Sequence, residues 1–369
     1  MLLISFFRLP RYRRMRRGLV GVALAAVVCS GCGTFGYVFS VAGGQLDILL
    51  ASRPIDDVLA TDELSDQQAD RLRMVLDVRQ FGIDRVSLDA GGNYTQYYDT
   101  GGKPPAYNVS ASRKDAFEPR TWTFPILGSL PYLGYFSLEG AQALETLLQE
   151  EGLDTLLVPV AAYSTLGFFD DPVFSSMLER DEAWLADLIL HEMTHTTVFR
   201  SGDIDFNESL ATFVGRAGSD IFLRERFGED APMVTLARER QEDSDRYNAF
   251  LRSLYGALDT FYKGGRSRDE KLAGREAVYA RMVETFKAET LPEFHDPEPY
   301  ERAVDMGLNN AWILANQRYN LDLDLFALVH DATGNDFRSS LAVFGEAAAS
   351  ADPKAYLRGW LESHPGDSP

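Results

Sequence analysis

Cysteine is nearly absent from this 369-residue sequence. Its two cysteines, Cys29 and Cys32, both lie in the phrase VVCSGCG at the end of an apolar run near the N-terminus. The rest of the chain therefore has no cysteines from which a disulfide framework could be built. With 45% hydrophobic and 12% aromatic residues, it is long and apolar enough to bury a sizeable core instead.

Positive charge is also scarce beyond the N-terminus. The sequence has 36 basic and 55 acidic residues, a formal net charge of -19. The first 31 positions contain no acidic residue and six basic ones, so the remainder carries 30 minus 55, or -25. These early basic residues are Arg8, Arg11, Arg13, Arg14, Arg16 and Arg17. A body this negative repels phosphate backbones, which argues against nucleic acid as a partner.

The sequence has no long apolar run that is clearly a membrane span. The run LVGVALAAVV, residues 19–28, follows the arginines, and this order is typical of a secretory signal peptide. An uncleaved anchor is the alternative, because residues 19–39 are just long enough to cross a bilayer.

The residues that end this run predict a lipid anchor. Ser30 and Gly31 before Cys32 resemble a bacterial lipobox, although Cys29 occupies a position where that pattern prefers leucine. We therefore predict a signal peptide over residues 1–31 and lipidation of Cys32. The protein would then be anchored in the outer membrane of the bacterial envelope and would face the periplasm. An ordinary signal peptide with incidental cysteines is the alternative.

Internal repeats are absent as well, and the remaining chain predicts a mixture of helices and strands. Apolar spacing indicates helices over residues 43–60 and 65–84. Residues 121–128 and 154–164 are expected to be buried strands, joined by a helix over 137–152. Strand, helix and strand with short joins predict two parallel strands linked by a right-handed crossover. From residue 181 onward the pattern predicts mostly helices.

Histidine is rare, with five in the whole sequence, yet two of them share the phrase HEMTH. On a helix, His191 and His195 lie one turn apart on one face, so their imidazole nitrogens can converge on one metal ion. Glu192 points about 100° away from His191, where it suits a general base beside the metal better than a ligand. Trp184 and Leu188 continue the histidine stripe, which predicts that it faces the interior. Two ordinary histidines on an amphipathic helix are the alternative.

The third ligand determines the subclass of metal site. Val198 and Ser201 occupy the positions where the pattern H-E-x-x-H-x-x-G-x-x-H requires glycine and histidine, which excludes that pattern. Glu208 on the next predicted helix can instead complete a thermolysin-like site of two histidines and one glutamate. Gly202 in the intervening turn would let the chain reverse. Close approach of the second helix would be allowed by the small residues Ala211, Thr212 and Gly215.

Glu208 also has a purely structural alternative. Asp205, three residues before it, makes a D-x-x-E sequence, in which Glu208 would bond only the backbone at a helix start. We favour the metal, because a dipositive ion with two neutral imidazoles favours an anionic third ligand. Asn207 is expected to cap or orient the helix and is assigned no chemistry.

Three protein ligands leave one position open, as in catalytic zinc sites. The pattern therefore predicts one Zn²⁺ per chain and hydrolysis of peptide bonds, with Glu192 taking a proton from water and passing it to the leaving amine. A donor for the developing oxyanion is expected too. Tyr163 is the first candidate and His330 the second, with a packing role for Tyr163 as the alternative. By analogy with gluzincins, the strand over 154–164 could bind extended substrate along its edge.

Five phrases, in order along the chain, resemble a family of predicted bacterial aminopeptidases found as envelope lipoproteins. They are VAGGQLDILLASRPIDDVL (41–59), EPRTWTFPILGSLPYLGYF (118–136), VPVAAYSTLGFFDDPVFSSML (158–178), LILHEMTHTTVF (188–199) and DFNESLATFVG (205–215). The resemblance implies peptide substrates, zinc ligation by His191, His195 and Glu208, and Glu192 as the catalytic glutamate. The G-x-M-x-N segment that binds the substrate amine in well-understood zinc aminopeptidases is absent, so removal of N-terminal residues rests on the resemblance.

These observations together predict an α+β protein with a gluzincin-like metallopeptidase core, a small sheet packed on the HEMTH helix. After the signal peptide we expect one unit, residues 32–369. It would comprise a helical N-terminal part (41–90), an α/β catalytic core (91–227) and a helical C-terminal part (228–369). A membrane-tethered endopeptidase and a non-catalytic lipoprotein stapled by its metal are the alternatives. Glu192 argues against the second, because a structural site has no use for a base.

Overall fold

The computed structural model describes residues 43–124, 128–162, 165 and 169–364. The chain divides into two units, Met1–Ser52 and Arg53–Pro369, and residues 43–51 of the first are helical. The predicted signal peptide, Cys29, Cys32 and Tyr163 lie outside the described residues, so the proposals for them stay predictions. Within the described ranges, no helix is long and apolar enough to cross a membrane.

The second unit begins with one long helix, α4 (Asp66–Phe81), and three short elements next to it in the sequence. The short elements are β1 (Arg53–Pro54), α3 (Ile55–Leu59) and the π-helical turn η2 (Gly82–Val86). Ser65 starts α4 with a capping box, because its hydroxyl accepts from Gln68 N at 3.3 Å while Gln68 Oε1 accepts from Ser65 N at 3.0 Å. The helix predicted over 43–60 is interrupted by β1, which pairs with β2 (Gln96–Tyr98). On its other side β2 pairs in parallel with β8 (Val173–Phe174).

A second sheet has β3 (Ala106–Ser112) at its centre, flanked by β6 (Tyr132–Tyr135) and β7 (Asp154–Val160). Both neighbours run antiparallel to β3. The predicted pair of parallel strands is therefore wrong. Instead, β4 (Trp122–Phe124) pairs antiparallel with β5 (Gly128–Leu130). Two reasons explain the difference. A short antiparallel connection closes a smaller loop than a crossover does. In addition, β7 pairs with β3, a weakly apolar strand that the sequence pattern did not reveal.

The helix α5 (Leu138–Glu150) packs on this sheet and confirms the helix expected there. Ser137 caps it, its hydroxyl accepting from Gly140 N at 3.1 Å. Residues Val109, Ala111, Ala141 and Leu148 form the buried centre of the contact. The helix α11 (Asn310–Tyr319) packs on the sheet as well.

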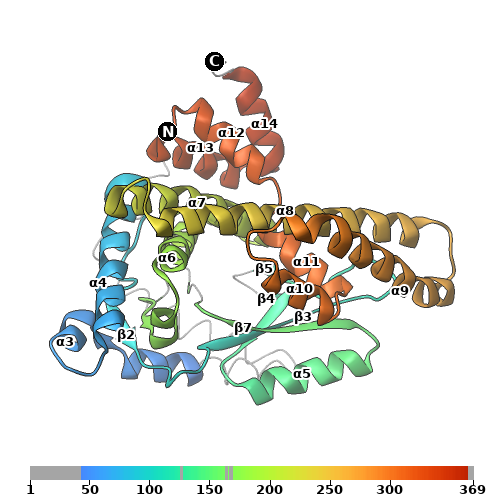
Figure 1. Ribbon diagram of the computed structural model, residues 1–369, viewed down its shortest axis with the longest axis horizontal. Coiled ribbons are helices and arrows are strands. Elements are labelled where there is room, and N and C mark those ends of the chain that lie inside the picture. Colours follow the sequence, from blue (N-terminus) through green and yellow to red (C-terminus); the bar gives the residue numbers. More distant parts are fainter. Residues whose placement is uncertain (1–42, 125–127, 163–164, 166–168, 365–369) are drawn as a thin grey trace. The chain divides into compact units, whose positions relative to one another are not determined.

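Helices make up most of the remaining chain (Figure 1). They are η3 (Ser175–Glu179), α6 (Glu182–Thr197), α7 (Ile204–Phe227), α8 (Pro232–Lys263), α9 (Arg268–Thr285), η4 (Phe286–Thr290), η5 (Leu291–Glu293), α10 (Glu298–Asp305), α12 (Leu323–Ala332), α13 (Phe337–Ala349) and α14 (Pro353–Ser363). The HEMTH helix is α6, and it packs on α4, α7 and α8. The protein is thus an α+β structure with small sheets and mostly helical content. The gluzincin-like arrangement of its core stays a prediction.

The helix α11 is anchored at both ends. At its start, Asp154 Oδ2 accepts from Asn310 N at 3.0 Å and from the buried Arg275 at 2.6 Å. At its end, the Ser209 hydroxyl of α7 donates to the carbonyl of Arg318 at 3.0 Å. These bonds tie α11 to β7 and to α7, so its last residues lie beside the first turns of α7.

Candidate metal centre

Two helices joined by a tight turn carry the candidate site. Asp181 caps α6 and accepts from Trp184 N at 3.1 Å. The chain reverses at Gly202, whose φ of 80° favours glycine, and α7 then starts at an Asp203 cap that accepts from Phe206 N at 3.2 Å. The two predicted helices and the reversal between them are confirmed.

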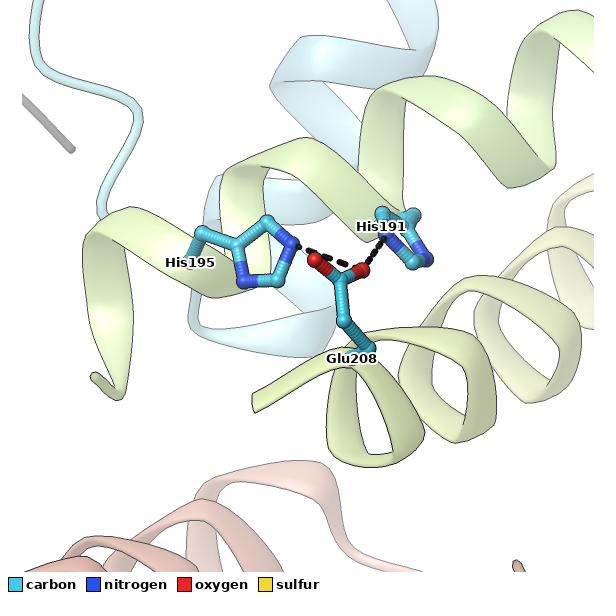
Figure 2. A group of neighbouring side chains, drawn as sticks. All are labelled: His191, His195 and Glu208. Carbon is cyan, nitrogen blue, oxygen red and sulfur yellow. Dashed lines mark hydrogen bonds and ion pairs between the residues drawn. The ribbon is translucent and has the colours of Figure 1, made fainter. Parts of the chain in front are cut away.

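The position of the cap decides against the structural alternative for Glu208. Because Asp203 rather than Asp205 is the N-cap, Glu208 lies too far along α7 to close a capping box. Asn207 holds the turn, since its side-chain amide accepts from Arg200 N at 2.9 Å and donates to Arg200 O at 2.8 Å. The carboxylate of Glu208 points towards α6 instead (Figure 2).

Small side chains let the two helices approach closely, as the sequence predicted. A Cβ atom added at Gly215 would lie 2.9 Å from the carbonyl oxygen of Asp187 and 3.2 Å from Cβ of His191. Ala211 and Thr212 are buried nearby on the same helix. This crossing sets the distance between the histidine side chains of α6 and Glu208 of α7.

The three candidate ligands converge at this crossing (Figure 2). Glu208 Oε2 lies 3.3 Å from His191 Nε2 and 3.6 Å from His195 Nε2, and the three ligand atoms all lie within 4.8 Å of one another. Tetrahedral bonds of about 2.0–2.2 Å would set donor atoms roughly 3.3–3.6 Å apart. The side chains could therefore hold a metal ion. Two imidazoles and a carboxylate suit zinc but also accept other divalent metals.

The three side chains are largely buried, with 14% of His191, 8% of His195 and 11% of Glu208 exposed. Burial by itself lowers the pKa of His191, but its bond to Glu208 and the nearby acids outweigh this and raise the pKa to about 9. For Glu208, burial raises the pKa, yet the two histidines hold it far below its usual range. The carboxylate of Glu208 is therefore ionised, as an anionic metal ligand must be.

The predicted inward stripe on α6 is only partly correct. Trp184 and Leu188 are half-buried, whereas Leu185, Ile189 and Met193 are fully buried. The histidines thus lie at the border of the buried face. At such a border the ligand atoms can face a substrate while the helix keeps its apolar packing.

Glu192 is buried beside the three ligands. Burial raises its pKa, although the positive charges of His191 and His195 oppose the shift. The same carboxylate contributes to the raised pKa of Tyr94, which is itself buried. A carboxylate that is desolvated and close to the ligands suits proton transfer.

Tyr319, the last residue of α11, is a site residue that the sequence did not reveal. Its ring centroid lies 6.2 Å from that of His191, and 36% of the residue is exposed. The charge of Glu208 and burial raise the pKa of Tyr319 well above its usual value. No local signal identifies this tyrosine, because it follows Glu208 by more than a hundred residues and reaches the site only through the packing of α11.

The second oxyanion candidate, His330, lies elsewhere. Its Nδ1 is 2.8 Å from the Ser340 hydroxyl, and its ring packs between Phe213 and Phe337. Burial lowers its pKa. The structure therefore packs His330 into the core, and its role as an oxyanion donor stays a prediction.

Comparisons with known proteins give one result. A family model described as "Putative aminopeptidase" matches residues 36–354, which is most of the chain. No curated protein and no solved structure matches the chain.

Proposed function

Since the chain belongs to the family described as "Putative aminopeptidase", we propose that it is a zinc-dependent aminopeptidase with a gluzincin-type site. The observation that carries the proposal is the convergence of three ligand atoms, two imidazole nitrogens and one carboxylate oxygen, within 4.8 Å of one another. A buried carboxylate, Glu192, lies close enough to interact electrostatically with all three side chains. Metal, base and an exposed tyrosine in one place are the parts that peptide hydrolysis needs.

Each residue of the site has a separate role in the proposed reaction. His191, His195 and Glu208 would hold the ion, which when bound supplies Lewis-acid chemistry by polarising a carbonyl oxygen and making water more acidic. Glu192 accepts a proton from the attacking water at a carboxylate oxygen and delivers it to the leaving amine. Burial of Glu192 favours this return of the proton, because its raised pKa makes the protonated form accessible.

Tyr319 is the oxyanion donor in this scheme. A tyrosine hydroxyl is protonated at neutral pH, and the charge of Glu208 raises the pKa of Tyr319 further, so the hydroxyl can donate a hydrogen bond to the oxygen that becomes negative. Its exposure lets a substrate reach it, and its ring lies next to that of His191.

The test combines metal analysis with two kinds of substrate. Residues 33–369 would be expressed and assayed for bound metal and for cleavage of aminoacyl reporters and internally quenched peptides. We expect about one zinc per chain, cleavage of the aminoacyl reporters, and loss of activity without loss of zinc in Glu192→Gln. Exposed Glu150 on α5 provides the matched control Glu150→Gln.

The alternatives predict different results in the same assay. Cleavage of the internally quenched peptides alone would identify an endopeptidase. Bound zinc with no hydrolysis of either substrate would favour a binding or assembly role. Absence of metal from the wild type would refute the site altogether.

The cellular location is proposed from the sequence. A lipid on Cys32 would anchor the protein in the bacterial envelope, at the outer membrane facing the periplasm, where it would act on peptides. In cell fractionation, Cys32→Ser should move the protein from the membrane to the soluble fraction. If the variant stays in the membrane, an uncleaved anchor over residues 19–39 is favoured.

A further inference from the structure

A buried arginine near the metal centre makes no side-chain hydrogen bond to the described residues. Only 7% of the Arg318 side chain is exposed, and its Nε atom has no hydrogen-bond partner within the described part of the chain. The nearest carboxylate oxygen, Oδ1 of Asp205, is 3.9 Å from Nε, which is too far for a hydrogen bond. A buried Nε–H group without an acceptor is costly, so its presence calls for an explanation.

The neighbours of Arg318 place it beside the candidate metal ligands. Its carbonyl accepts from the hydroxyl of Ser209, the residue after Glu208, and its guanidinium faces Asp205, one helical turn before Glu208. The next residue in the chain is Tyr319, whose ring lies near that of His191. The guanidinium therefore lies on the part of α7 that carries Glu208.

The separation from the ligands corresponds to a short stretch of peptide. Residues three apart on a helix have Cβ atoms about 5–6 Å apart, and Arg318 Nε lies 3.9 Å from Asp205. The guanidinium is thus at most on the order of 10 Å from Glu208. An extended peptide advances roughly 3.4 Å per residue, so the separation spans at most about three residues.

Building on the function proposed above, we propose that Arg318 binds a carboxylate of the peptide substrate, within about three residues of the bond that is cleaved. A planar guanidinium with parallel N–H donors matches a carboxylate better than any other side chain does. The Tyr132 ring covers one face of the guanidinium, with its centroid 5.3 Å from the guanidinium carbon. In a protein with a net charge of -19, a carboxylate ligand also needs such a local cation.

A structural ion pair with Asp205 explains the arginine less well. The pair lacks a hydrogen bond, and 54% of the Asp205 side chain is exposed to water, which weakens the attraction. Replacing Arg318 by methionine should therefore leave the melting temperature unchanged or raised, as expected for a buried charge without bonded partners.

The carboxylate could be the C-terminus of a short peptide or an acidic side chain of a longer one, and three probes distinguish them. They are the tripeptide Ala-Ala-Ala as the free acid, its C-terminal amide, and the amide of Ala-Ala-Glu. Binding is measured by calorimetry on the zinc-loaded Glu192→Gln protein, which holds substrate without cleaving it. We expect the free acid to bind about 10- to 100-fold more tightly than the neutral amide. Restoration of tight binding by the glutamate amide would identify a side-chain carboxylate as the ligand.

The variants decide whether Arg318 is responsible. Adding Arg318→Met should abolish the preference for carboxylate. Arg318→Lys should keep only part of the preference, because lysine retains the positive charge but lacks the parallel N–H donors of a guanidinium. Asp205→Asn is the matched control and should leave the preference unchanged or stronger. Equal binding of acid and amide, or a preference that survives Arg318→Met or disappears in Asp205→Asn, overturns the inference.

Because binding and cleavage are measured separately, the two proposals can fail independently. An Arg318-dependent preference without hydrolysis by the wild type would refute the peptidase and keep the carboxylate site. Hydrolysis without any carboxylate preference would do the opposite.

Discussion

The crossing of α6 and α7 at Gly215 sets the geometry of the candidate metal centre, and Gly215→Ala perturbs it with a single methyl group. The added Cβ would lie 2.9 Å from the backbone oxygen of Asp187, where ordinary contacts begin at 3.4 Å. It would also lie 2.4 Å from Oδ1 of Asp187, but that side chain can rotate away. The backbone contact cannot be relieved without moving the helices apart by roughly 0.5 Å.

Two effects on stability oppose each other in this variant. Alanine stabilises a helix interior by about 0.5–1 kcal/mol relative to glycine, whereas overpacking typically costs about 1–3 kcal/mol. The net change in the free energy of unfolding should be a loss of up to about 2.5 kcal/mol. Zinc affinity should respond more strongly, because metal–ligand distances tolerate only about 0.2 Å. We expect a loss of affinity of about 10- to 100-fold, similar to the loss of an outer-shell partner.

Competition with a chromogenic chelator measures the zinc affinity, and thermal unfolding measures the stability. Gly256→Ala on α8 is the matched control, because its added Cβ would have no atom within 4 Å. That variant should be slightly stabilised and bind zinc like the wild type. If Gly215→Ala also binds zinc as tightly as the wild type, the helix crossing does not control the site and the reasoning is refuted.

Three further changes test other parts of the site. Glu208→Ala should lower zinc affinity by at least about 10-fold, and unchanged affinity would remove Glu208 from the ligand set. Tyr319→Phe should lower kcat by about 10²- to 10³-fold with zinc content and KM little changed, whereas an unchanged kcat would exclude the oxyanion role. Asp171→Asn tests burial near Glu192, because burial raises the pKa of Asp171 to about 7, above its unfolded value of about 3.9. In the wild type, the cost of ionising the buried Asp171 lowers the free energy of unfolding progressively from about pH 4 to 7, by at most roughly 4 kcal/mol. Asparagine removes this cost. The variant should therefore gain more in melting temperature at pH 8 than at pH 5. An equal gain at both pH values would contradict the raised pKa.

Features that depend on neighbouring residues could be predicted from the sequence alone. His191 and His195 lie on one helix face because their spacing matches one helical turn, and this holds wherever the helix packs. The reversal at Gly202 and the cap at Ser137 are local in the same way. Such features require only short-range hydrogen bonds and backbone geometry.

Features that depend on distant segments were decided by the tertiary structure. The sequence left Glu208 as either a cap or a ligand, and only the Asp203 cap and the close crossing of α6 and α7 turn its carboxylate to the histidines. The antiparallel pairing of β7 with β3, which overturned the parallel crossover, likewise follows from strand partners that no local pattern specifies. Arg318 and Tyr319 lie near the candidate metal centre because bonds at both ends of α11 hold it against β7 and α7. These segments are far apart in the sequence, and only the packing of the whole unit brings them together. The local spacing of residues does not specify that packing.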